Sequence, residues 1–320
     1  MRWVVYGAGA VGGVLGGRLY DAGHDVVLVA RGEHLRAIQD DGLTLASPEG
    51  SRTLPVPAVA AAHEIDLAGP TVVLLAVKSH QTQDALSDLT AVVDPHTPVV
   101  SLQNGVDNEA TLLRHYQDVQ GVCVMMPTVH LEPGVVEAHC SPVPGILDVG
   151  RFPGGTNDTT HLVAEAFRSA GFESEARGDI MAWKYRKLMM NLGNAVQACC
   201  GSGPGSDELN GRARVEGEAV LAAAGIPVID EAYELERRGD ILQYGAIPGR
   251  GRTGGSTWQS LRRATGTIES DYLNGEVVLL GRLHDVPTPV NELLRRTALR
   301  MSRNGAEPGS VAAADLLAEL

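Results

Sequence analysis

A lysine and two asparagines recur at helical spacing in residues 183–194. Lys187, Asn191 and Asn194 stand at positions i, i+4 and i+7, so a helix would place an ammonium group and two amides on one face. The residues around them are mostly Leu and Met, which predicts a helix that is buried over much of its circumference. Polar groups on such a helix need partners. One interpretation is a general acid with amides that orient a substrate; the alternative is a structural or solvent-facing polar stripe.

Lys184 lies three residues before Lys187 and is the competing candidate for the acid. Its position nearer the start of the predicted helix favours contact with solvent. We therefore expect Lys187 to be the functional lysine, and we expect replacement of Lys184 by alanine to cost little.

A glycine-rich turn follows the first apolar run of the chain. Residues 2–6 lead directly into a GxGxxG pattern, and a helical pattern follows it. In this setting the first glycine permits a tight turn, the second lets the backbone approach a pyrophosphate, and the third allows close packing of helix on strand. The predicted dinucleotide-binding turn comprises Gly7, Ala8, Gly9, Ala10, Val11 and Gly12. The alternative is a glycine-rich turn that binds no ligand.

The second apolar run, residues 25–29, is followed by Ala30 and Arg31. An NAD-preferring site usually has Asp or Glu here, against the ribose 2′-hydroxyl. A guanidinium can instead bind a 2′-phosphate bidentately. Arg31 therefore favours NADPH, and a solvated surface arginine is the alternative.

Polar residues end the next two predicted strands. Lys78 follows the run 71–77, and Asn104 follows the run 98–102 and Gln103. The carboxyl ends of strands in an open parallel sheet face the ligand crevice. We expect Lys78 to meet cofactor oxygens or an anionic substrate and Asn104 to bind the nicotinamide half. Ordinary loop positions are the alternative for both.

Apolar runs and helical patterns alternate through the first half of the chain. This alternation is typical of an α/β, Rossmann-like, doubly wound parallel sheet. The runs lie at 2–6, 25–29, 71–77, 98–102 and 121–125, and the helical patterns at 11–22, 81–93 and 108–116. Residues 128–150 are interrupted by Pro and Gly and predict hairpin-type strands appended to that sheet.

From about residue 179 the strand patterns fade and helical periodicity continues to Met301. Gly- and Pro-rich connections interrupt it at 201–206 and 245–255. The sequence thus predicts an NADP-binding domain over 1–178 and a mainly α-helical catalytic or substrate domain over 179–320.

The composition excludes several classes of partner. The 320 residues carry 26 basic and 39 acidic side chains, a formal charge of −13, which disfavours nucleic acid and anionic membranes. The longest apolar runs are too short to cross a bilayer, and the first residues leave no room for a signal peptide. The four cysteines have no CxxC spacing. We expect a cytoplasmic protein without a metal site.

Six motifs in a fixed order resemble those of the ketopantoate reductase family, the 2-dehydropantoate 2-reductases. They are GAGAVGG, LLAVKSHQ, LQNGVDNE, KYRKLMMN, STWQSLRR and IESDYLNG. The resemblance spans roughly residues 1–300. It implies a Rossmann-like domain followed by an α-helical domain, with the active site in the cleft between them, and NADPH-dependent reduction of a 2-oxo acid, with ketopantoate reduced to pantoate.

The resemblance also implies roles for individual residues. Lys187 matches the family's proton donor, and Glu269 matches the acidic residue beside the cofactor and the reacting centre. Asn191 and Ser256 match residues that hold the substrate. The positions that match NADPH contacts are Arg31, Lys78 and Asn104.

Two departures from the family pattern concern substrate recognition. Asn194 follows Asn191 by three residues where the family commonly has four, and Ser206 stands near the place of a third asparagine. Two other functions thus stay open: reduction of a different 2-oxo acid or carbonyl compound, and a non-catalytic NADP(H) sensor. A homodimer through the helical domain is a further expectation.

Overall fold

The computed structural model describes residues 1–251, 254–263 and 266–320. The chain divides into two compact units. The first unit contains Met1–Lys184 and Glu231–Gly251, and the second contains Tyr185–Asp230 and the described residues after Gly251. Each unit has its own hydrophobic core.

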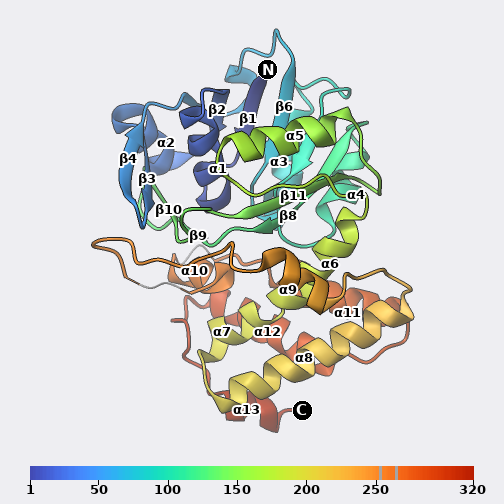
Figure 1. Ribbon diagram of the computed structural model, residues 1–320. Helices are drawn as coiled ribbons and strands as arrows, with labels where there is room; N and C mark the ends of the chain where they lie inside the picture. Colours follow the sequence, from blue (N-terminus) through green and yellow to red (C-terminus); the bar gives the residue numbers. More distant parts are fainter. Residues whose placement is uncertain (252–253, 264–265) are drawn as a thin grey trace. The chain divides into compact units, whose positions relative to one another are not determined.

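The first unit is built on a seven-stranded sheet (Figure 1). Its spatial order is β11 (Ile146–Arg151), β8 (Val119–Met125), β7 (Val99–Ser101), β6 (Thr71–Leu75), β1 (Arg2–Tyr6), β2 (Asp25–Val29) and β5 (Ala58–Val59). All neighbouring strands are parallel except β11, which is antiparallel to β8. The chain runs outward from β1 in both directions, so the strand order reverses there, at the place where such folds bind ligands.

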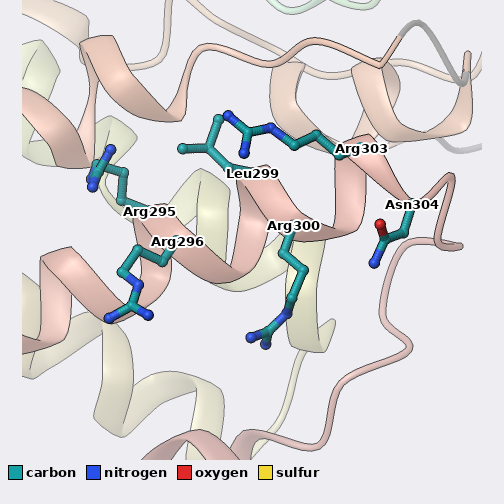
Figure 2. Close-up of a pocket in the computed structure, with 6 residues that line it drawn as sticks. All are labelled: Arg295, Arg296, Leu299, Arg300, Arg303 and Asn304. Atoms are coloured by element: carbon teal, nitrogen blue, oxygen red, sulfur yellow. The ribbon is translucent and has the colours of Figure 1, made fainter.

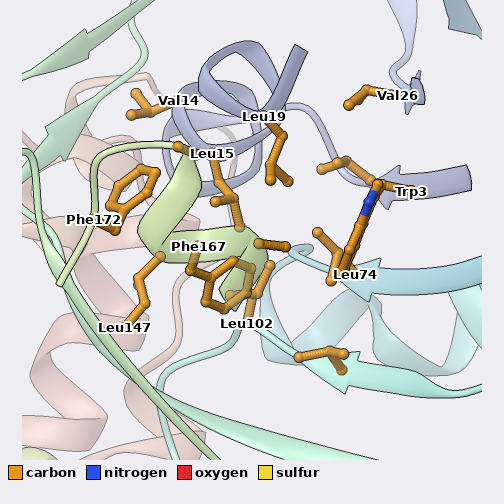
Figure 3. Close-up of a cluster of buried hydrophobic side chains, with 14 of the residues drawn as sticks. Trp3, Val14, Leu15, Leu19, Val26, Leu74, Leu102, Leu147, Phe167 and Phe172 are labelled. Carbon is orange, nitrogen blue, oxygen red and sulfur yellow. The ribbon is translucent and has the colours of Figure 1, made fainter. Parts of the chain in front are cut away.

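Helices cover both faces of this sheet. Trp3 and Val5 of β1 join a core with α1 (Ala10–Asp21) and α5 (Asp158–Ser169), which Figure 3 shows. Val4 and Tyr6 point the other way, into a core with α3 (Thr82–Leu89) and α4 (Asn108–Leu113). The expected Rossmann-like fold is confirmed, and its central strands are rich in Val and Leu because both faces are buried.

A second, four-stranded sheet in this unit was not predicted. Its order is β4 (Gly50–Leu54), β3 (Leu43–Ser47), β10 (Val135–Ala138) and β9 (Thr128–Val129). Residues 128–150 are therefore divided: β11 extends the large sheet as expected, whereas β9 and β10 belong to the small one. Strands β3 and β4 follow α2 (Gly32–Asp41) in the chain, whereas β9 and β10 follow β8.

Glycines let helix α1 pack closely against both sheets. A Cβ atom on Gly16 would lie 2.5 Å from Leu28 of the large sheet. A Cβ atom on Gly13 would lie 2.7 Å from Val136, and one on Gly17 would lie 2.8 Å from Leu45, both in the small sheet. These glycines beyond the GxGxxG pattern therefore have a packing reason.

The second unit is helical, as expected. Helix α6 (Ile180–Asn191) crosses the division between the units, and the later helices are α7 (Gly193–Cys200), α8 (Pro204–Ala223), α10 (Ser256–Arg262), α11 (Asn274–Leu283), α12 (Pro289–Arg303) and α13 (Ala313–Ala318). In the part of the chain that the structure describes, no helix combines the length and apolarity that crossing a membrane requires.

One segment of the second half of the chain belongs to the first unit. The predicted domains, 1–178 and 179–320, differ from the observed units because Glu231–Gly251, including α9 (Glu231–Arg238), packs with the first. Arg237 donates to both carboxylate oxygens of buried Asp148, at 2.9 and 3.2 Å. Arg250 donates to Glu137 of β10 at 2.6 Å. Charged contacts hold the segment in place.

Candidate active site

The glycine-rich turn between β1 and α1 has the geometry of a dinucleotide-binding turn. Gly7 has φ +105°, a conformation that favours glycine, and the Gly7 and Ala8 amides donate to the Val29 carbonyl at 3.0 and 3.1 Å. A Cβ atom on Gly12 would overlap the Gly7 carbonyl, whereas a Cβ atom on Gly9 would meet no atom of the residues that the structure describes within 4 Å. The backbone is thus open to a ligand at the second glycine.

The N-terminus of α1 is also suited to an anion. Gly9 is its N-cap and makes no side-chain capping bond, and the first turn carries no acidic residue. The first N–H groups of a helix lack intrahelical partners and carry a positive partial charge, so they can bind a pyrophosphate. These residues fit a dinucleotide cofactor.

His34 holds this turn in place, which the sequence did not indicate. Its Nδ1 accepts a hydrogen bond from the Gly134 amide at 2.9 Å, so the ring proton is on Nε2, which donates to the Ala8 carbonyl at 2.7 Å. Burial lowers the pKa of His34, which favours this neutral form. The His130 ring lies against it, with 4.1 Å between centroids.

Arg31 lies at the carboxyl end of β2, as the N-cap residue of α2. Its side chain is exposed, and its Nη2 donates to the Tyr6 hydroxyl at 3.2 Å. Tyr6 is the last residue of β1, directly before the glycine-rich turn.

Lys78 and Asn104 lie on two loops that are bonded to each other. Ser79, next to Lys78, donates to the Asn104 carbonyl at 3.4 Å. The side-chain Nδ2 of Asn108 donates to Ser79 Oγ at 3.2 Å and to the Asn104 backbone carbonyl at 3.3 Å. The structure thus brings together the carboxyl ends of β6 and β7, as the parallel sheet predicted, and leaves both candidate side chains half-exposed.

Lys184 is buried, which corrects the expectation that it contacts solvent. Its side chain is 3% exposed, and Nζ lies 2.7 Å from Oε1 of Glu109, which is 0% exposed. The same Nζ donates to the carbonyls of Gln103 at 2.8 Å and Val122 at 3.2 Å. Lys184 therefore holds the strand end that carries Asn104, and its replacement by alanine cannot be neutral.

Lys187 and Asn191 share a face of α6, but Asn194 lies on the next helix. Helix α6 ends at Asn191 and α7 begins at Gly193. Leu192, between them, keeps helical dihedral angles, and its carbonyl accepts a hydrogen bond from Asn274 Nδ2 at 3.2 Å. A side-chain donor at a helix carbonyl is a recognised cause of a helix break. The expectation of a single helix with all three residues is wrong at this point.

Asn194 lies beside the residue that precedes Ser256. A Cβ atom on Gly255 would be 3.2 Å from Asn194 Oδ1, and the Gly255 amide donates to Gln197 Oε1 at 2.8 Å. Gly255 is the N-cap of α10, and Ser256 is its first residue. Two predicted substrate residues, Asn194 and Ser256, therefore meet at the start of α10, and Gln197 is an additional residue there.

Glu269 is buried in the second unit, before the short helix Ser270–Tyr272. Burial lowers the pKa of the Arg263 guanidinium, and the charge of Glu269 opposes that shift. Arg263 is thus a charged neighbour of Glu269 that the sequence did not single out. Ser206 is buried in α8.

A basic hollow of about 500 Å³ lies along α12, apart from these residues. Figure 2 shows that its guanidinium groups point in different directions and do not converge. It is lined by Arg295, Arg296, Leu299, Arg300, Arg303 and Asn304. None of the predicted site residues lines this hollow, so it is not the candidate active site. Within residues 1–251, 254–263 and 266–320, no group of His, Cys, Asp or Glu is arranged to hold a metal ion.

Sequence comparison assigns the chain to a family. The family profile "Ketopantoate reductase PanE/ApbA" matches residues 3–154, and the profile of the C-terminal part of that family matches residues 179–299. The chain belongs to the ketopantoate reductase family. A relative named 2-dehydropantoate 2-reductase from Pyrococcus horikoshii is 31% identical over 303 residues, which cover 92% of this chain and 95% of the relative.

Solved structures resemble this ketopantoate reductase family member over nearly its whole length. A PanE/ApbA family ketopantoate reductase from Ralstonia eutropha JMP134 is 29% identical, with a TM-score of 0.80 over 95% of this chain and 99% of that chain. D-mandelate dehydrogenase, solved with NADH and anilino(oxo)acetate, has a TM-score of 0.81 over 95% of this chain and 99% of that one, at 21% identity. The second likeness shows the fold alone. Because that neighbour was solved with NADH, the fold by itself does not select the cofactor.

Proposed function

We propose that this chain is a 2-dehydropantoate 2-reductase, which reduces ketopantoate to pantoate with NADPH. The observation that carries the proposal is the match of both ketopantoate reductase profiles, in order, to residues 3–154 and 179–299. The open turn at Gly9 and the uncapped start of α1 support the cofactor half of the proposal.

The first unit supplies the residues that bind the cofactor. The turn Gly7–Gly12 carries the pyrophosphate site, where the backbone amides at the start of α1, from Gly9 to Gly12, hold the pyrophosphate, and Arg31 binds the 2′-phosphate. From the ends of β6 and β7, Lys78 meets cofactor oxygens or the anionic substrate and Asn104 hydrogen-bonds the nicotinamide half. When bound, NADPH supplies a hydride to the keto carbon of the substrate.

The second unit supplies the proton and the substrate contacts. As the keto oxygen gains charge, Lys187 donates a hydrogen bond and then its proton, so the product leaves as a 2-hydroxy acid and the lysine is reprotonated from water. The amides of Asn191 and Asn194 and the hydroxyl of Ser256 orient the carboxylate and the substrate hydroxyl. Glu269 lies beside the reacting centre in this scheme.

The substrate is tested by following NADPH oxidation with a set of 2-oxo acids. We expect ketopantoate to give the highest kcat/KM. 2-Oxoisovalerate, which lacks the hydroxymethyl group, should give a much lower kcat/KM, because the polar groups that bind the hydroxyl would have no partner. A higher kcat/KM with another 2-oxo acid would show that the altered Asn191–Asn194 spacing has changed the substrate. No turnover with any of them, with NADPH still bound, would indicate a sensor.

Arg31→Ala tests the cofactor. We expect this change to raise the Kd of NADPH by about tenfold or more, because a hydrogen-bonded charge pair with phosphate is lost. The Kd of NADH should change less than twofold. Arg36→Ala, an exposed arginine of α2, tests a second candidate for the 2′-phosphate, and Arg114→Ala, an exposed arginine elsewhere in the first unit, is the matched control. Fluorescence titration measures all of these values, and equal affinity of the unaltered protein for NADPH and NADH would contradict the assignment.

The proposal includes a cytoplasmic enzyme that forms a homodimer through its helical unit. Sedimentation velocity of the purified full-length chain measures the oligomeric state, and a monomer at micromolar concentration would exclude the dimer.

A further inference from the structure

The Tyr6 hydroxyl lies between an exposed arginine and a carboxylate. Arg31 Nη2 donates to Tyr6 Oη at 3.2 Å, and Tyr6 Oη in turn donates to Asp88 Oδ2 at 2.8 Å. Asp88 Oδ2 also accepts from the Ala62 amide at 2.9 Å. Tyr6 belongs to β1, Arg31 directly precedes α2, and Asp88 belongs to α3. The large sheet and α3 therefore fix the positions of the two hydrogen bonds.

The orientation of the hydroxyl follows from these partners. A carboxylate only accepts hydrogen bonds and a guanidinium only donates them, so the Tyr6 proton points to Asp88 and an oxygen lone pair points to Arg31. Burial, reinforced by Asp88, raises the pKa of Tyr6 to about 12. The Tyr6 hydroxyl therefore stays protonated over the working pH range, so its proton remains available for the hydrogen bond to Asp88.

Few contacts other than the bond to Tyr6 restrict the Arg31 side chain. Its side chain is exposed, and it forms no ion pair with a carboxylate of the described residues. A guanidinium has five N–H donors, so one bond to Tyr6 leaves donors for a phosphate. A long side chain that is already held loses less conformational entropy when it binds.

We propose that Tyr6 is a specificity-determining positioning residue, which holds the Arg31 guanidinium for the 2′-phosphate of NADPH and thereby favours NADPH over NADH. This inference rests on the proposed cofactor. Tyr6 acts through Arg31 and does not itself touch the phosphate. Asp88 supports it by fixing the direction of the hydroxyl.

The test is Tyr6→Phe, which removes the hydroxyl and keeps the ring in the core. We expect the Kd of NADPH to rise about threefold to tenfold, as for the loss of one hydrogen bond, and the Kd of NADH to change less than twofold. The KM for NADPH should rise in parallel while kcat at saturating NADPH is retained. The Kd of adenosine 2′-phosphate, a probe without nicotinamide, should rise by the same factor.

Tyr116→Phe is the matched control. Tyr6 and Tyr116 are both 2% exposed and belong to the same core, but the Tyr116 hydroxyl has no hydrogen-bond partner among the described residues. Its removal should leave both cofactor affinities unchanged. An equal effect of Tyr116→Phe on the Kd of NADPH would overturn the inference, because core packing would then explain the result.

A double-mutant cycle separates this inference from the proposed function. In an Arg31→Ala background, Tyr6→Phe should have no further effect on NADPH. If the unaltered protein preferred NADH, the proposed cofactor would be wrong. If it preferred NADPH but Tyr6→Phe left that preference unchanged, or weakened both cofactors equally, only the role of Tyr6 would be wrong.

Discussion

Lys187→Ala is expected to lower kcat by about a hundredfold to ten-thousandfold, the usual cost of losing a general acid, while NADPH binding stays nearly intact. The amine is the proton donor in the proposed reaction, and the cofactor residues lie in the first unit. Steady-state turnover on the best 2-oxo acid measures the first effect, and fluorescence titration of NADPH measures the second.

Lys187→Arg distinguishes proton donation from charge alone. Arginine keeps the positive charge and can donate hydrogen bonds, but its pKa is too high for it to release a proton readily. We therefore expect Lys187→Arg to remain impaired. Turnover near that of the unaltered enzyme in Lys187→Arg would mean that the charge alone is needed, and high turnover in Lys187→Ala would exclude Lys187 as the acid.

Lys184→Ala is expected to lower the free energy of unfolding by about 3–5 kcal/mol, the cost of breaking a buried ion pair from one side. Glu109, which is 0% exposed, would be left buried without its ion-pair partner. The carbonyls of Gln103 and Val122 would also lose a donor. Urea denaturation followed by tryptophan fluorescence measures the change.

An exposed ion pair provides the control for Lys184→Ala. Arg212 and Glu208 pair on the surface of α8, each about half-exposed, and such pairs contribute about 0–1 kcal/mol. Arg212→Ala should therefore shift the urea midpoint very little. If Lys184→Ala were equally mild, the buried pair would not be the stabilising contact that its geometry indicates.

Most strands of the large sheet were predictable because apolar residues dominate them, whereas the two-residue β5 (Ala58–Val59) was not predicted. The predicted runs 2–6 and 25–29 have the same bounds as β1 and β2, and the predicted run 71–77 contains β6 (Thr71–Leu75). The small sheet was missed because its strands mix polar and apolar residues, as in β3 (LTLAS) and β4 (GSRTL), and because β9 and β10 are far from them in the chain. Short strands without a long periodic pattern resemble loops.

The candidate site was predictable where local sequence decides the geometry. The glycine-rich turn and the strand ends at Lys78 and Asn104 are local features. The burial of Lys184 was not predictable, because its partners Glu109 and Gln103 lie 75 or more residues earlier in the chain. The helix break after Asn191 depends similarly on Asn274, 82 residues from the carbonyl that it bonds.

Because Glu231–Gly251 belongs to the first unit, that unit contains residues that are synthesised after part of the second unit. When Lys184 leaves the ribosome, Asp148 has Arg177 as a partner but lacks Arg237, and Glu137 lacks Arg250. At about 5–20 residues per second, the arrival of Arg250 takes roughly 3–13 s longer. Much of the second unit is synthesised during that interval. The contacts of the N-terminal unit can therefore be completed only after residues 185–230 of its neighbour have been synthesised, so the order of synthesis links the two units.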